Sequence, residues 1–177
     1  SSAYGGGSSA PYQNTYASLD GSNYVTYTWT FPADVRRIKA TIVGGGGGKQ
    51  SGGSNSGGGG QMIITTFNVE DSSINSVSVI VGAGGAQGQN GGVSSVKAGN
   101  AYAEAGGGEK GDADGHGVPV NGNTNGVLTT INCPGSAGAA STGGATGSYL
   151  KKYGTGAPLE ANDTNGDDGI VILEWLQ

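Results

Sequence analysis

The sequence predicts an all-β fold in which glycine-rich segments alternate with strands. Apolar residues recur at every second position in several short stretches, which is the pattern of a strand with one buried and one solvent-facing side. No apolar stripe of useful length follows the 3.6-residue period of a helix. Glycine and β-branched residues, which oppose helix formation, are abundant throughout. We therefore expect a compact, β-sandwich-like domain with glycine-rich segments between its strands.

The composition limits the classes of protein to which the chain can belong. Glycine supplies 39 of its 177 residues, against roughly 7% in ordinary proteins. No strict three-residue repeat of the collagen type runs along the chain, and no apolar run is long enough to span a membrane. A single cysteine, Cys133, excludes an intrachain disulfide framework. The net charge of −5 argues against binding to nucleic acid.

The first twenty residues differ from the rest of the chain. They are polar, and they carry a glycine triplet and three isolated tyrosines, Tyr4, Tyr12 and Tyr16. One interpretation is a linker. The other is an extended arm that joins this domain to a preceding part, with the tyrosines packed on a neighbour.

The first predicted strand covers residues 24–31, followed by a turn at 32–34 and a second strand at 35–43. In the first strand Val25, Tyr27, Trp29 and Phe31 share one face, and threonines occupy the other. In the second, the inner face is predicted to hold Ile38, Ala40 and Ile42, and the outer face to hold Lys39 and Thr41.

Further strands are predicted along the rest of the chain. Residues 61–70 and 74–81 form two, separated by a turn at 71–73, and residues 93–98 and 127–132 form two shorter ones. The final strand, 169–176, is apolar on both faces. A strand of that kind is buried on both sides, so we expect it to lie centrally in a sheet.

Glycine-rich segments connect these strands, at 44–48, 51–60, 82–92, 106–117 and 135–147. In a threefold extended helix of the polyproline-II type, glycine at every third position lets neighbouring helices pack closely. The series Gly82, Gly85, Gly88 and Gly91 has this spacing. The series Gly135, Gly138, Gly144 and Gly147 has it too, with Ser141 in the missing place.

The aliphatic content is small for a chain of this length, about 17% Leu, Ile, Val and Phe together. We infer that such polyglycine-II helices satisfy one another's backbone groups, or that several chains share a core, or both.

The order of these segments resembles the glycine-rich receptor-binding tip domain of phage tail fibres and related bacterial fibre adhesins. The matching pieces are WTFP at 29–32, IVGGGGG at 42–48, VGAGG at 81–85 and GDDGIVI at 166–172. The resemblance implies a domain at the tip of a fibre, often a homotrimer, whose variable loops contact a bacterial surface receptor. It further implies that residues 1–22 are an arm from a fibre stalk and that residues 23–177 are the tip. The turn at 71–73 replaces a proline–glycine turn that is usual in the family.

The sequence offers little for catalysis. His116 is the only histidine, no G-x-S-x-G nucleophile motif follows a strand, and the glycine run at 44–48 lacks the ending of a phosphate-binding loop. Cys133 precedes a proline in a glycine-rich stretch and is interpreted as an unreactive thiol. We therefore expect neither an enzyme nor a bound cofactor.

Two stretches have oxygen ligands at spacings that a cation could use. Asp163, Asn165 and Asp167 partly resemble a calcium loop, although an Asx-rich turn before the last strand explains them equally well. Asp112, Asp114 and His116 form a second candidate, for which the alternative is a solvated loop. Both remain weak metal candidates.

Binding is the best-supported function. Residues 109–126 are predicted to form a long polar loop, whose candidate ligand-binding side chains are Asp112, Asp114, His116, Asn121, Asn123 and Asn125. A second loop offers Tyr149, Lys151 and Tyr153. Exposed tyrosines provide flat faces for stacking on a sugar or a protein. The alternative is that these tyrosines only cover the glycine segments.

These observations lead to one main hypothesis and two alternatives. The main hypothesis is an extracellular receptor-binding adhesin at the tip of a trimeric fibre, carried by a virion or a bacterium. Its partner would be a bacterial surface glycan or an outer-membrane protein, and it would not insert into the membrane. The first alternative is a structural cap or spacer without a ligand. The second is a hydrolase of surface polysaccharide that uses paired carboxylates.

Overall fold

A computed structural model describes residues 13–17, 24–140, 142–158 and 163–175, and these residues form two stacked antiparallel sheets without a helix. The prediction of an all-β sandwich is confirmed. The first sheet has the strand order β1 (Gln13–Ala17), β10 (Ile170–Trp175), β3 (Arg37–Val43), β4 (Met62–Asn68) and β9 (Thr129–Cys133). The second has the order β2 (Tyr24–Thr30), β5 (Ser76–Gly82), β6 (Ser94–Ala98), β7 (Ala101–Ala105) and β8 (Thr124–Asn125).

All seven predicted strands are present with slightly different ends. β10 lies between β1 and β3, as its two apolar faces predicted. Three strands were not predicted, namely β1, β7 and β8. β1 falls within the segment 1–22 that was interpreted as an arm, and there it pairs with β10 along its whole length. Tyr4 and Tyr12 lie outside the described residues.

The inward faces of the two sheets form the main core. β3 and β4 contribute Ile38, Ala40, Ile42, Ile63 and Phe67, and the facing sheet contributes Val77, Val79, Val81 and Val96. Aromatic residues close the side of the core next to β1 and β2. The rings of Tyr16 and Tyr27 lie 4.9 Å apart, and the Tyr27 hydroxyl donates to the carbonyl of Ala17 (2.8 Å).

A second, smaller cluster covers part of the outward face of the first sheet. Val43, Met62 and Ile170 are buried there, with Leu150 and Tyr153 packed against them. Thr41 belongs to the same outward face, and it is buried, whereas the sequence placed it in solvent. The period-two pattern assigned the face of Thr41 correctly, but it could not predict that this face is partly covered.

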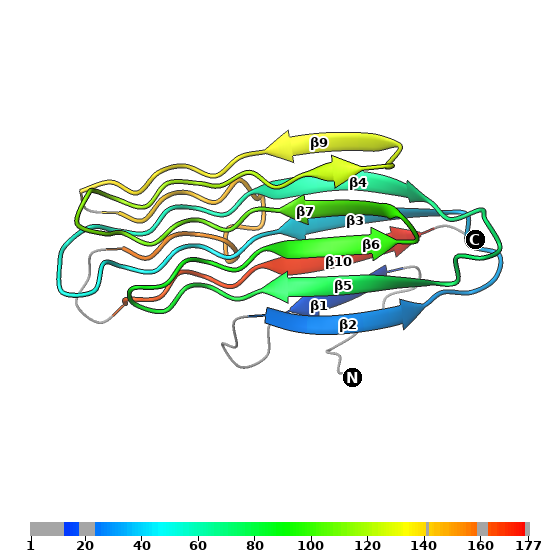
Figure 1. The fold of residues 1–177 in the computed structure, drawn as a ribbon, viewed down its shortest axis with the longest axis horizontal. Coiled ribbons are helices and arrows are strands. Elements are labelled where there is room, and N and C mark those ends of the chain that lie inside the picture. Colours follow the sequence, from blue (N-terminus) through cyan, green and yellow to red (C-terminus); the bar gives the residue numbers. More distant parts are fainter. Residues whose placement is uncertain (1–12, 18–23, 141, 159–162, 176–177) are drawn as a thin grey trace.

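The glycine-rich segments continue several strands beyond the sandwich as parallel wavy traces (Figure 1). We call this region the glycine lattice; it comprises residues 44–49, 57–61, 83–86, 89–92, 106–111, 116–122, 134–138, 143–147, 154–157 and 164–169. Its hydrogen bonds change partner with a period of three. The amides of Gly44 and Gly47 donate to segment 57–61, those of Gly45 and Gly48 to segment 89–92, and those of Gly46 and Lys49 to segment 164–169.

This period is that of threefold extended helices packed side by side. Such helices have no internal hydrogen bonds, so their backbone groups must be satisfied by neighbours. The carbonyls of Gly45, Gly46 and Gly47 accept from Gly108, Gly85 and Ala157. Within this one chain, the glycine segments therefore satisfy one another's backbone groups, as one of the inferences from the sequence proposed.

Glycine is needed in the lattice for space. A Cβ placed on any of the glycines at 44–48 would lie closer than 3.0 Å to a backbone atom of another segment. Positive φ values occur in the described residues at only a few glycines, such as Gly88 (φ 77°). Gly88 lies in the turn between segments 83–86 and 89–92. The equally spaced glycine series of the sequence therefore does not run along one helix, because a turn interrupts it.

The sandwich and the lattice lie at opposite ends of an elongated molecule (Figure 1). Gln13 pairs with Glu174, so the described chain begins and finishes at the end of the sandwich that is away from the lattice. We call the opposite extremity the turn end; it comprises residues 50–55, 87–90, 110–116 and 163–165.

Candidate functional site

The turn at 112–115 is held rigidly at the turn end. Asp112 and Gly115 exchange backbone hydrogen bonds of 3.0 and 3.2 Å, and the Asp114 amide donates to the Asp112 carboxylate (2.8 Å). Asn55 from the neighbouring hairpin donates its side-chain amide to the Asp112 carbonyl (2.6 Å). The side chains of Asp112 and Asp114 are therefore presented on a fixed backbone.

His116 joins two hairpins. Its Nδ1 accepts the backbone N–H of Ser56 (3.0 Å), and the Ser56 hydroxyl, 3.1 Å from that nitrogen, donates to the carbonyl of Ala139 (3.0 Å). A backbone N–H can only donate, so Nδ1 carries no proton and Nε2 does. His116 is half-buried, and its Nε2–H is the group that remains for a ligand.

A shallow depression of about 250 Å³ lies among the turns. Its lining comes from three hairpins and consists of Gln50, Ser51, Gly88, Lys110, Gly111, Asp112 and Ala113. Of these, the sequence analysis selected only Asp112. Gln50 and Ser51 lie where two glycine-rich segments meet, and that position could have identified them. Gly88, Lys110, Gly111 and Ala113 lie inside such segments, where no pattern in the sequence marks the turn.

The predicted loop at 109–126 is a hairpin that runs the length of the lattice, so its candidate residues are separated. Asp112, Asp114 and His116 lie at or next to the turn end. Asn123 lies at the sandwich, where its carbonyl accepts from the Glu104 amide (2.8 Å), and Asn125 belongs to β8 opposite Tyr102. Asn121 precedes them on the same returning segment.

The second predicted loop lies beside the first sheet and away from the turn end. Tyr153 packs on the outward cluster of Val43, Met62 and Ile170. Tyr149 is 60% exposed, and Lys151 is exposed as well. Tyr153 therefore covers apolar surface, which is close to the alternative considered for the two tyrosines. Tyr149 remains available to a partner.

The two weak metal candidates, residues 112–116 and 163–167, lie at the turn end or next to it. Among the residues that the structure describes, no group of three or more His, Cys, Asp or Glu side chains is placed to hold a metal ion. Asp168 accepts the amide of Gly84 (2.8 Å) and so joins the last lattice segment to a neighbouring one. Partial burial, followed by the negative charge of Asp163, raises the pKa of Asp167 above its usual value.

This shift predicts a pH-dependent effect of Asp167 on stability. A carboxyl group with a raised pKa stabilises the fold while it is protonated, and the contribution is lost as the pH rises from the ordinary Asp range through the raised pKa. We expect Asp167→Asn to raise the thermal unfolding midpoint at pH 7 and to leave it nearly unchanged at pH 3. Asp114→Asn, at an exposed turn position, is the control, and an equal rise in both variants at pH 7 would contradict the prediction.

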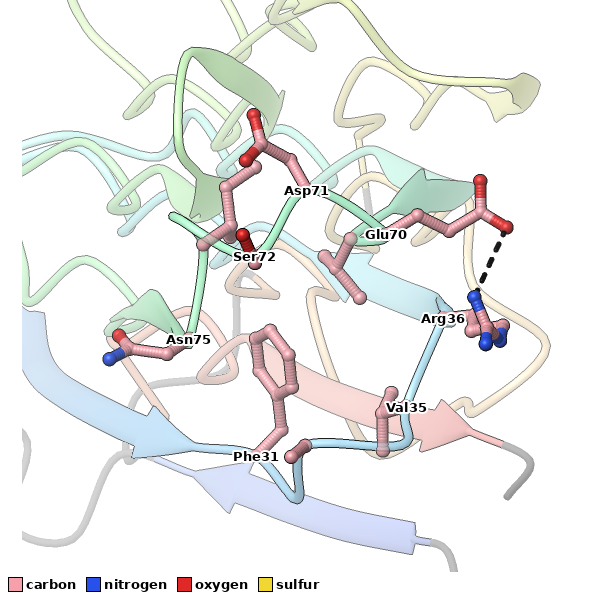
Figure 2. A pocket seen from close by; sticks show the side chains of 10 residues that line it. Phe31, Val35, Arg36, Glu70, Asp71, Ser72 and Asn75 are labelled. Carbon is pink, nitrogen blue, oxygen red and sulfur yellow. Dashed lines mark ion pairs between the residues drawn. The ribbon is translucent and has the colours of Figure 1, made fainter.

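A further pocket, of about 380 Å³, lies between the β2–β3 and β4–β5 connections, at the end of the molecule away from the lattice (Figure 1). Figure 2 shows its lining side chains. Phe31, Val35 and Val69 supply apolar lining. At its rim Glu70 forms exposed ion pairs with Arg36 (4.0 Å) and Arg37 (3.2 Å), which contribute little to stability.

The Asp71 turn beside this pocket replaces the proline–glycine turn mentioned above. The Asp71 carboxylate accepts the amide (2.9 Å) and the hydroxyl (2.8 Å) of Ser73. These two bonds lower the pKa of Asp71. Side-chain hydrogen bonds between Asp71 and Ser73 therefore stabilise the turn between β4 and β5 in place of proline and glycine.

The chain is thus a glycine-rich β-sandwich whose strands continue into a packed glycine lattice. The family model of the glycine-rich domain matches residues 21–170, and the chain belongs to that family. No match to a curated protein was found. The described part of the chain contains no helix of the length and apolarity that a membrane span requires.

Proposed function

We propose that this chain is the receptor-binding tip of an extracellular fibre, on a virion or a bacterial surface, and that the turn end binds a bacterial surface glycan or outer-membrane protein. The observation that carries the proposal is the separation of the two ends of the molecule. The described chain begins and finishes at the sandwich end, and the rigid polar turns lie at the other end (Figure 1). A domain attached through its sandwich presents these turns first.

The backbone hydrogen bonds of the glycine lattice support a binding role for the turn end. Binding residues are commonly carried by loops on a rigid scaffold, and here the scaffold is formed by backbone hydrogen bonds. The side chains of Ser51, Lys110 and Asp114 form no hydrogen bond or ion pair with another residue in the described part of the chain. They can therefore contact a partner, or be exchanged, without loss of a lattice bond.

Assembly of three copies is part of the proposal. β9 is the edge strand of the first sheet, and Ile131 on it is 57% exposed. Ile131 pairs with the half-buried Ile64 of β4. An exposed edge strand with apolar side chains favours contact with another chain, and light scattering distinguishes three copies from one.

A binding experiment on whole cells tests the function. We expect the triple variant Ser51→Ala, Lys110→Ala, Asp114→Ala to bind a susceptible strain at least tenfold more weakly, as measured with fluorescent protein across a panel of Gram-negative bacteria. The matched control is the double variant Tyr149→Ala, Lys151→Ala, which alters the side of the molecule. Weaker binding of the control alone would refute the turn end as the site. Failure of the unaltered protein to bind any strain would support the structural cap instead.

A further inference from the structure

The outward face of the second sheet has a depression of about 390 Å³ in a position that the turn end does not reach. Two rows of side chains cross the strands there in register. One row runs from Ser78 through Lys97 to Tyr102, and the next runs from Ile80 through Ser95 to Glu104. The threonines of β2 extend both rows, since Thr28 lies opposite Ser78 and Thr26 opposite Ile80.

The polar groups of this face have no partners within the part of the chain that the structure describes. Lys97, Tyr102 and Glu104 form no side-chain hydrogen bond or ion pair with another described residue. Lys97 and Glu104 lie on neighbouring strands in adjacent rows, a diagonal separation at which long side chains can meet. Lys97 as a donor, Glu104 as an acceptor and the half-buried ring of Tyr102 are thus available to one ligand.

The first sheet provides an internal comparison. On its outward face Lys39 and Glu174 lie directly opposite each other, and they form an ion pair of 3.8 Å. The same two residue types are therefore paired on one sheet and left unpaired on the other. The unpaired set is the one that lines a depression and includes an aromatic side chain.

The chemistry of the depression restricts its ligand. Its backbone cannot add a further strand, because β6 is hydrogen-bonded on both sides, to β5 and to β7, so a partner is recognised through side chains alone. Five of the seven lining residues, Ser78, Ser95, Lys97, Tyr102 and Glu104, carry a polar group on an apolar stem or ring. The depression therefore offers a ligand both apolar surface and hydrogen-bonding groups. Its volume lies at the lower end of the range for small-ligand sites, about 300–1,000 Å³.

We propose that this face binds a neutral oligosaccharide. A pyranose ring stacks on the face of Tyr102, as flat, partly apolar surfaces do on tyrosine. Neighbouring hydroxyls of a sugar act as both donors and acceptors, so they match the carboxylate of Glu104 and the ammonium of Lys97 together. Ser78 and Ser95 add hydroxyl groups beside them. This site goes beyond the proposed function, because it is separate from the turn end.

Titration calorimetry with maltohexaose, cellohexaose and mannohexaose, one at a time, tests the inference. We expect at least one of the three to bind, Tyr102→Ala to weaken that binding at least tenfold, and Tyr102→Phe to keep it within about threefold, since the ring remains. Glu104→Gln should weaken it at least threefold. Lys39→Ala on the opposite sheet is the matched control and should change nothing. Far-UV circular dichroism verifies that each variant is folded.

Three results would overturn the proposal. The first is that none of the three oligosaccharides binds the unaltered protein, and the second is that Tyr102→Ala binds as well as the unaltered protein does. The third is a loss of oligosaccharide binding in the turn-end triple variant, which would place the sugar at the turns. If that variant loses binding to cells and keeps binding to the oligosaccharide, the sheet-face site is supported as a separate one. A protein that binds sugar through Tyr102 and binds no cell would leave this inference standing without the proposed function.

Discussion

Replacing Gly47 with alanine is expected to lower the free energy of unfolding by about 2–6 kcal/mol. The added Cβ would meet the carbonyl of Glu109 closer than 3.0 Å. Gly47 also donates to Gly58 and accepts from Ala157, both at 2.9 Å. The new methyl group must push one segment away, and a shift of that kind costs about 1–3 kcal/mol of overpacking together with one weakened buried hydrogen bond, at about 1–3 kcal/mol.

Gly53→Ala is the matched control for this prediction. A Cβ at Gly53 meets only the end of the flexible Gln50 side chain, so we expect a change within about 1 kcal/mol. Urea unfolding followed by circular dichroism measures both variants. Equal losses at the two positions would mean that the backbones of the lattice are not in close contact, and the explanation of the glycine content given above would then be wrong.

The sequence predicted the strands with strong alternation and missed those without it. β2, β3 and β5 have β-branched or aromatic residues on a consistent face, and that pattern is direct evidence of a sheet. β7 has three alanines among its five residues, and alanine is depleted in strands. β7 is held in the sheet by its pairing with β6. Strand pairing cannot be predicted from the local pattern of apolar residues.

The glycine lattice could be predicted in kind but not in detail. Abundant glycine between strands indicated threefold helices that satisfy one another's backbone groups. Which segments are neighbours could not be predicted, because glycine has no side chain to mark a face. The alternative that several chains share a core has less support, since segments of one chain supply these hydrogen bonds. The predicted trimer now rests on exposed surface such as Ile131.

The candidate sites were predicted less completely than the fold. Polar residues at 109–126 were grouped as one loop because they are adjacent in sequence, although a hairpin separates Asp112 from Asn125. The bond between Ser56 and His116 joins residues 60 positions apart, beyond the reach of any local pattern. The sheet-face depression was also missed, because Ser78, Lys97 and Glu104 are ordinary solvent-facing residues until the register of three strands brings them together.

Gln61 occupies the junction where the lattice meets the sandwich, and its side chain is expected to be essential there. It is 1% exposed. Its Oε1 accepts the backbone amides of Gly106 (2.9 Å) and Gly122 (2.8 Å), and its Nε2 donates to the Asn132 side chain (2.6 Å). One amide group thus joins both segments of the 106–122 hairpin to β9.

Gln61→Leu keeps a side chain of similar size and removes all three hydrogen bonds. The amides of Gly106 and Gly122 then lose their acceptor, and a buried amide without a partner costs about 1–3 kcal/mol. We therefore expect the variant to be less stable by about 2–5 kcal/mol. Native-state hydrogen exchange should show faster exchange at Gly106 and Gly122, while the amide of Gly47, bonded to Gly58 within the lattice, remains protected.

Asn132→Ala separates these two effects. It removes the bond to Nε2 from an exposed partner and leaves Oε1 in place. We therefore expect a loss of about 0.5–1.5 kcal/mol, the net contribution of one hydrogen bond, and no change in exchange at Gly106. If Gln61→Leu were no more damaging than Asn132→Ala, another group would have to accept the two glycine amides. The junction would then depend on the backbone alone, and a polar side chain buried between sandwich and lattice would have no structural reason to be there.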